Sequence, residues 1–171
     1  PEIGQSIRAC VTPLLTNFNI TEVPNDIILS VSKKDYQWIK ELAKVGTLRN
    51  ISFVGDNLPS SKVDGETVLG RIPIMKLLGA VAGLYPISQD HALLAMHTDR
   101  WLILADEFLT GEKSLDYVSR LLSTALSSSD FLASCYVPTA ADIILSSVIT
   151  DLRVYPNNVE LWIKRLCKIL N

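Results

Sequence analysis

Histidine and cysteine are scarce in this chain of 171 residues, which has two histidines and three cysteines. His91 and His97 do not share one helix face at their spacing, so we expect no shared metal site. Cys10, Cys135 and Cys167 are far apart and form neither a CxxC pair nor a metal-binding spacing. Because their number is odd, we expect reduced thiols in a cytosolic protein, with the nucleus as a further location.

A marked excess of one charge and long apolar runs are also missing. The formal net charge is −2, which argues against direct binding of nucleic acid and against binding to an anionic membrane. No stretch approaches the roughly 18 uninterrupted apolar residues of a membrane span, and no signal peptide is evident. The chain begins with Pro1 rather than Met, so we expect it to be a piece of something longer.

Hydrophobic residues are plentiful, at 48% of the chain, which is enough for a well-buried core. The first half alternates short β-type runs at 27–31 and 48–54 with helical stripes at 6–18, 35–45 and 74–84. Asp64-Gly65, between two short strand-like stretches, is typical of a hairpin turn. After Tyr85-Pro86 the expected elements are all helices, at 89–109, 114–126, 140–152 and 159–170. We therefore expect an α+β fold, with one subdomain at 1–84 and an all-helical one at 88–171.

The most specific local signal is the sequence Thr139-Ala-Ala-Asp142, which has the pattern of a capping box. Thr139 can accept a hydrogen bond from the amide three residues on, and Asp142 can reach back to the Thr139 amide. The segment that follows, 143–149, is almost wholly apolar. We therefore expect this helix to lie in the middle of the core.

The stretch from Phe131 through this capping box resembles the core helix of the glutathione-transferase C-terminal domain. Two other segments are similar to the same family. Thr98-Asp99-Arg100-Trp101-Leu102 resembles the start of its long helix, and 57–65 resembles the loop and hairpin of its thioredoxin-like half. The resemblance implies a glutathione-transferase-like fold with a thioredoxin-like N-terminal half. If 6–18 is the first helix of that half, the strand that should precede it is missing.

An active glutathione transferase needs a Tyr, Ser or Cys after the first strand, a cis-proline turn, and an acceptor–serine pair that starts helix three. Leu58-Pro59 could supply the turn. With the first strand missing, Cys10 is better explained as a core residue and Ser6 as a helix N-cap. Gly70-Arg71 stands where the acceptor–serine pair should be. We therefore expect no catalytic residue and no cofactor.

Catalytically silent domains of this family serve as docking modules on translation factors and aminoacyl-tRNA synthetases. This chain most resembles the AIMP-type scaffold proteins of the multi-aminoacyl-tRNA-synthetase complex. The segments that carry the resemblance are 101–108, 125–133, 138–149 and 158–164.

The resemblance implies two docking surfaces. The first would lie on helices two to four and use Ile72, Ile74, Met75, Leu78, Gly79, Ala82, Met96 and Arg100. Gly79 and Ala82 would let a partner helix approach closely, although the same side chains could instead pack the two halves together. The second surface, on helix seven, would use Leu161, Lys164 and Arg165. The docking domains carry an arginine where this chain has Leu161, and leucine cannot supply the same recognition. Leu161 could make an apolar contact instead, Lys164 or Arg165 could replace the arginine, or the surface could be lost.

We therefore expect a non-catalytic scaffold domain that docks other glutathione-transferase-like domains and aminoacyl-tRNA synthetases, and that can form a homodimer when alone. The alternatives are a glutathione-dependent transferase, or a docking domain attached to a synthetase or to an elongation-factor subunit. If Met75 lies on the docking surface, Met75→Glu should weaken partner binding and leave the melting temperature nearly unchanged.

Overall fold

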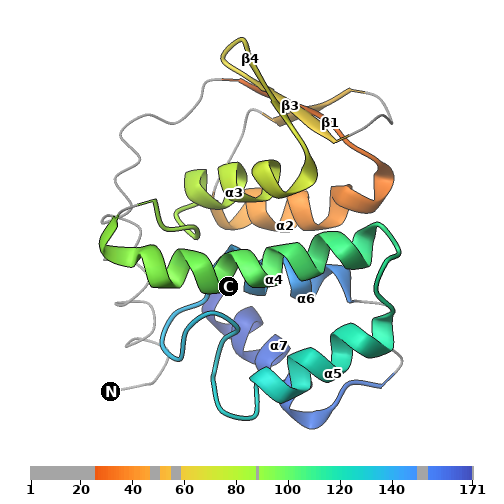
Figure 1. Cartoon of the computed structure of the whole chain (residues 1–171), viewed down its shortest axis with the longest axis vertical. Helices are drawn as coiled ribbons and strands as arrows, with labels where there is room; N and C mark the ends of the chain where they lie inside the picture. Colours follow the sequence, from red (N-terminus) through yellow and green to blue (C-terminus); the bar gives the residue numbers. More distant parts are fainter. Residues whose placement is uncertain (1–25, 47–50, 55–58, 88, 150–153, 171) are drawn as a thin grey trace.

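The computed structural model describes residues 26–46, 51–54, 59–87, 89–149 and 154–170. Its first part is a four-stranded sheet with two helices packed against one side (Figure 1). The strands are β1 (Ile27–Ser30), β2 (Ile51–Phe53), β3 (Ser60–Val63) and β4 (Glu66–Leu69). The helices are α2 (Tyr36–Gly46), which follows the 3-10 turn η1 (Lys33–Asp35), and α3 (Arg71–Val81).

The strand order is β2-β1-β3-β4, with β1 and β2 parallel and the other neighbours antiparallel. Strand β1 therefore precedes α2 and pairs with the strand that follows it, as in a βαβ unit. The expectation that this strand is missing is wrong, because it took 6–18 as the first helix of the unit. That segment, with Ser6 and Cys10, lies outside the described residues.

The hairpin predicted at Asp64-Gly65 is confirmed. Asp64 and Gly65 both have positive φ, at 48° and 93°, and they join β3 to β4. A two-residue turn of this kind requires the left-handed backbone at both central positions, which Gly adopts freely and Asp tolerates. The turn therefore sets the register in which Val63 lies opposite Glu66.

The second part is helical, as expected. Its helices are η2 (Gln89–His91), α4 (Ala92–Leu109), α5 (Leu115–Ala125), α6 (Ala140–Val148) and α7 (Asn157–Leu170). Helix α6 ends earlier than the predicted residue 152, and α7 begins two residues before the predicted start. Ser114 caps α5, since its side chain accepts a hydrogen bond from the Tyr117 amide at 3.2 Å.

Helix α6 lies in the centre of the molecule, where it packs against both α2 and α4. It is buried along most of its length, which confirms its prediction as a core helix. The buried hydrophobic side chains of the sheet-bearing part and of the helical part form a single cluster around it. The division of the chain at residues 84–88 stays a prediction, since one core spans both parts.

Asp142 ties the start of α6 to two other segments. Thr139 and Asp142 form the predicted capping box, in which the Thr139 amide donates to Asp142 Oδ2 at 2.9 Å. Asp142 Oδ1 also accepts from the Leu132 amide at 3.0 Å and from Trp162 Nε1, on α7, at 2.9 Å. Burial of this carboxyl raises its pKa to about 6, although the hydrogen bonds act in the opposite direction.

The raised pKa of Asp142 predicts how stability changes with pH. The folded carboxyl binds a proton more tightly than the unfolded one, so this contribution is complete below pH 3.8 and is lost as the pH rises through 6. Between pH 5 and pH 7 it should lower the free energy of unfolding by about 1 kcal/mol. Urea unfolding of the wild type and of Asp142→Asn at both pH values measures this. The variant should show the smaller change; an equal change in both proteins would mean that Asp142 titrates normally.

Candidate functional site

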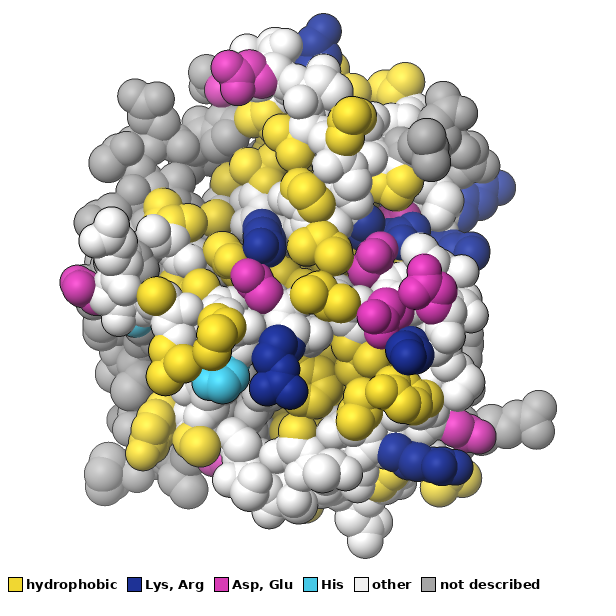
Figure 2. All heavy atoms as spheres, viewed as in Figure 1, with side chains coloured by type: hydrophobic (Ala, Val, Ile, Leu, Met, Phe, Trp, Pro, Cys, Tyr) yellow, Lys and Arg dark blue, Asp and Glu magenta, His cyan; other side chains and the backbone are white. Residues whose placement is uncertain are grey.

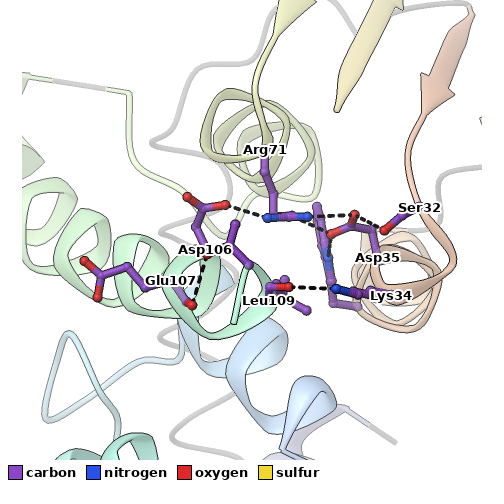
Figure 3. Close-up of polar contacts among 9 residues, drawn as sticks. Ser32, Lys34, Asp35, Arg71, Asp106, Glu107 and Leu109 are labelled. Carbon is purple, nitrogen blue, oxygen red and sulfur yellow. Dashed lines mark hydrogen bonds and ion pairs between the residues drawn. The ribbon is translucent and has the colours of Figure 1, made fainter. Parts of the chain in front are cut away.

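The turn that follows β1 and the second half of α4 both meet the start of α3. Arg71, at the start of α3, extends its guanidinium between two carboxylates (Figure 3). Its Nε lies 2.8 Å from Asp35 Oδ1 and its Nη2 lies 3.3 Å from Asp35 Oδ2. Its Nη1 lies 2.7 Å from Asp106 Oδ1, on α4. One arginine therefore joins all three segments.

Asp35 is the buried centre of this cluster, with a relative exposure of 0%. Besides Arg71, it accepts hydrogen bonds from Trp38 Nε1 at 2.8 Å and from Ser32 Oγ at 3.3 Å. Burial acts to lower the pKa of Arg71, but its hydrogen bonds and the charges of Asp35 and Asp106 outweigh this and raise it. The arginine is therefore held as a cation by two carboxylates of its own chain.

The cluster also occupies the place where the resemblance puts an anion site. The N-terminus of a helix attracts anions, and in an active transferase the acceptor–serine pair works there. The structure places Gly70 at the N-cap of α3 and Arg71 as its first residue, as the resemblance implied. Since the Arg71 guanidinium already faces Asp35 and Asp106, it is not free to bind an incoming carboxylate.

Ser32 is a residue that sequence reasoning missed. It lies two residues after the end of β1, at the N-cap of η1. The resemblance places a catalytic Tyr, Ser or Cys in this region, but with 6–18 taken as the first helix, β1 was not expected to be the first strand. The β-type run at 27–31, followed at once by Ser32 and a helical stripe, was the signal that could have found it. Leu58 of the turn predicted at Leu58-Pro59 lies outside the described residues.

Most of the α3 residues predicted to bind a partner lie inside the core. Ile74, Met75 and Leu78 have a relative exposure of 0%, Gly79 is buried, and Ala82 is 7% exposed. Their assignment to a docking surface is wrong, since side chains enclosed by their own chain cannot touch a partner. Met75→Glu would put a charge into this core and would not test docking. Ile72 remains half-buried.

The close helix contact predicted for Gly79 exists, but its partner is α6 of the same chain. A Cβ at position 79 would lie 2.8 Å from Ala140 Cβ and 3.1 Å from Tyr85 Cβ. The Gly79 carbonyl also accepts the amides of Leu84 and Tyr85, at 2.7 and 3.1 Å. The small residue therefore serves internal packing and the turn that ends α3.

Met96 and Arg100, in contrast, lie on the surface. Together with Leu93 and Ile103 they follow one face of α4, and we name these four residues the α4 stripe. The relative exposures of Leu93, Met96 and Ile103 are 64%, 52% and 45%, and Arg100 is exposed. Figure 2 shows this side of the molecule, where hydrophobic side chains gather over α3 and α4 with charged groups among them.

The proposed surface on α7 is partly occupied by internal contacts. Leu161 is 57% exposed, and Lys164 is exposed and pairs with Glu160 at 2.7 Å. Arg165 Nη1 donates to the Asp130 carbonyl at 2.7 Å, so its guanidinium fixes the loop before α6. Trp162 is fully buried, as predicted. The docking role of Leu161, Lys164 and Arg165 stays a prediction.

Two further findings concern the described part of the chain. It has no group of three or more His, Cys, Asp or Glu side chains placed to hold a metal ion. None of its helices combines the length and the apolar character that crossing a membrane requires.

Gly79→Ala should lower the free energy of unfolding by about 1–3 kcal/mol, since the added methyl group must displace Ala140 or Tyr85. Alanine has the higher helix propensity by about 1 kcal/mol, so helix propensity alone predicts the opposite sign. Chemical denaturation measures the difference. A stabilised variant would show that α3 and α6 have room for the methyl group.

Arg71→Met should cost about 3–5 kcal/mol, because it leaves the carboxylate of Asp35 buried without its cation. The matched control is Lys76→Met, which removes the partly exposed pair of Lys76 with Asp99 and should cost less than about 1 kcal/mol. Adding Asp35→Asn to Arg71→Met should recover part of the loss. Equal costs for the two single variants would mean that the Arg71 pair is no more important than a surface pair.

No protein-family model matches the chain, and no curated protein is significantly similar to it in sequence. Solved structures are similar in fold. The theta class glutathione S-transferase of Xanthomonas axonopodis pv. citri with glutathione bound has a TM-score of 0.62 and 16% identity, covering 85% of this chain and 93% of that one.

Two other structures are similar. For the glutathione transferase BmGSTD1 of Bombyx mori the TM-score is 0.57 and the identity 18%, with 87% of this chain and 91% of that chain covered. For the GST-like domain of elongation factor 1-gamma from Saccharomyces cerevisiae the values are 0.53 and 12%, with 85% and 87% covered. At these identities the similarity concerns the fold alone. The chain therefore has a glutathione-transferase-like α+β fold, with a thioredoxin-like N-terminal half and a helical C-terminal half.

Proposed function

We propose that this chain is a non-catalytic docking domain, which holds aminoacyl-tRNA synthetases or other translation proteins together through contacts with glutathione-transferase-like domains. The observation that carries the proposal is the Arg71 cluster. It fills the start of α3 with a cation and two carboxylates of the chain itself. A carboxylate ligand that bound there would have to displace Asp35 or Asp106, and would meet their negative charge.

The α4 stripe is the surface that we propose for docking. On its inner side α4 buries Leu102 and Ala105, while Leu93, Met96 and Ile103 remain exposed on the outside. A helix that is apolar on both sides is expected to be covered on both sides. The stripe extends over about 15 Å of helix, and it combines Met with Arg, two residue types enriched at interfaces. Leu161 and Lys164 of α7 would form a second contact.

The assignment to translation rests on likeness rather than on a contact. One structural neighbour is the GST-like domain of elongation factor 1-gamma. The other support is the resemblance of segments 101–108, 125–133, 138–149 and 158–164 to the second AIMP-type scaffold protein of the multi-aminoacyl-tRNA-synthetase complex. A docking domain appended to a synthetase or to an elongation-factor subunit would use the same α4 stripe.

A glutathione-dependent transferase is the second candidate, and Ser32 favours it. This hydroxyl follows β1, in the region where the resemblance expects a catalytic side chain. To stabilise a thiolate, however, it would have to donate its proton to sulfur. In the structure Ser32 Oγ donates to Asp35 Oδ2 at 3.3 Å, and Asp35 is held by Arg71. The proton is therefore directed away from a ligand, and we rank the docking function first.

Met96→Glu should weaken partner binding at least tenfold, because the carboxylate would enter the interface without a partner charge. The side chain is 52% exposed, so the free energy of unfolding should change little. The matched control is Val154→Glu, at an exposed position outside α4. Tagged wild type and both variants are used to capture partners from the cytosol of the source organism, and the captured proteins are quantified by mass spectrometry.

Capture of synthetases or translation factors by the wild type and by Val154→Glu, with loss for Met96→Glu, is the expected result. Equal capture by all three proteins would show that the α4 stripe is not the docking surface. Calorimetry with glutathione and a conjugation assay test the second candidate. Turnover that disappears in Ser32→Ala would overturn the non-catalytic assignment.

A further inference from the structure

A hollow of about 350 Å³ lies between α2, α6 and α7. It shares no residue with the Arg71 cluster or with the α4 stripe. Its volume is at the lower end of the range for small-molecule sites, roughly 300–1,000 Å³. The hollow is therefore large enough for one small ligand and is independent of the proposed docking surface.

The wall that α2 contributes is polar except for Val45. Gln37, Glu41 and Lys44 line it from successive turns of the helix. Glu41 accepts a hydrogen bond from Gln37 Nε2 at 3.4 Å. Lys44 is exposed and has no ion pair within the described part of the chain. This wall therefore offers a ligand two opposite charges, the Glu41 carboxylate and the ammonium group at its Lys44 end.

The opposite wall is apolar. Ile163, Leu166 and Cys167 of α7 line it, and Ile143 of α6 forms part of the floor. The serines of the floor do not add free donors. Ser146 Oγ donates to the Ile143 carbonyl at 2.9 Å, and Ser147 Oγ donates to the Ile144 carbonyl at 2.8 Å. The hollow therefore has an apolar side, and its charged groups are the Lys44 ammonium at one end and the Glu41 carboxylate on the same wall.

We propose that this hollow binds an aliphatic carboxylate. The chain lies against the α7 wall, where its burial is favourable, and the carboxylate accepts a charge-assisted hydrogen bond from Lys44 Nζ. Glu41 repels a carboxylate and thereby sets the orientation, with the negative end toward Lys44. A second hollow of about 360 Å³ is adjacent to the first, since Gln37 and Ser147 line both.

Decanoate is the probe, and two cysteines provide the readout. Cys167 lines the hollow, while Cys135 lies in the loop before α6, and both are exposed free thiols. A ligand in the hollow should slow the alkylation of Cys167 by iodoacetamide and leave Cys135 unchanged. Mass spectrometry of the peptides follows each cysteine separately. Decanol and decylamine, at the same concentration below micelle formation, should protect Cys167 less than decanoate does.

Variants test the recognition of charge. Lys44→Met keeps the aliphatic stem and should weaken decanoate binding roughly two- to fivefold, the range for an ion pair at an exposed rim. Lys40→Met, on the same helix but outside the lining, should have no effect. Ser146→Leu fills the floor and should abolish protection, and Met96→Glu should leave it unchanged. Equal protection of both cysteines, or equal affinity of Lys44→Met and Lys40→Met, would overturn the proposal.

Discussion

The ion pair between Arg71 and Asp35 joins parts of the chain that are 36 residues apart in sequence. It anchors the turn after β1 to the start of α3, and through Asp106 it reaches α4. Removing the charges of Arg71 and Asp35 from water costs free energy. Four hydrogen bonds donated to the buried Asp35 carboxylate offset this cost. The same contacts decide the chemistry of the region. Arg71 is engaged by two carboxylates and Ser32 donates to one of them, and these contacts support the proposal of a non-catalytic domain.

Helix α6 supplies the second constraint, through packing. Gly79 allows α3 to approach it at a distance where a methyl group already meets Ala140. At its start, Asp142 holds Leu132 and Trp162 through hydrogen bonds to a fully buried carboxyl. The polar group is tolerated in the core because each of its oxygens has donors. Packing and capping thus place α3, α6 and α7 together, and the outer side of α4 is left on the surface.

Local signals predicted the local structure well. The capping box at Thr139 and Asp142, the turn at Asp64-Gly65 and the helical half are confirmed, because each depends on residues close in sequence. The errors concern tertiary placement. Helix α3 is apolar on several sides, and its pattern alone does not tell which side meets α6 and which meets solvent. The pairing of Arg71 with Asp35 has no local signature at all. Ser32 was missed because the helical pattern at 6–18, which lies outside the described residues, was taken as the first helix.

Because most of the α3 residues are buried, the exposed side of α4 becomes the proposed docking surface. Small and apolar residues of α3 are equally consistent with internal packing and with a partner's approach, and the burial of Met75 and Leu78 settles this in favour of packing. Within the part of the chain that the structure describes, Leu93, Met96 and Ile103 have no such internal explanation, since α4 leaves these side chains exposed while it buries Leu102. Three large apolar side chains aligned on one exposed helix face cost solubility unless something covers them. For this reason the proposed docking contact moves from α3 to α4.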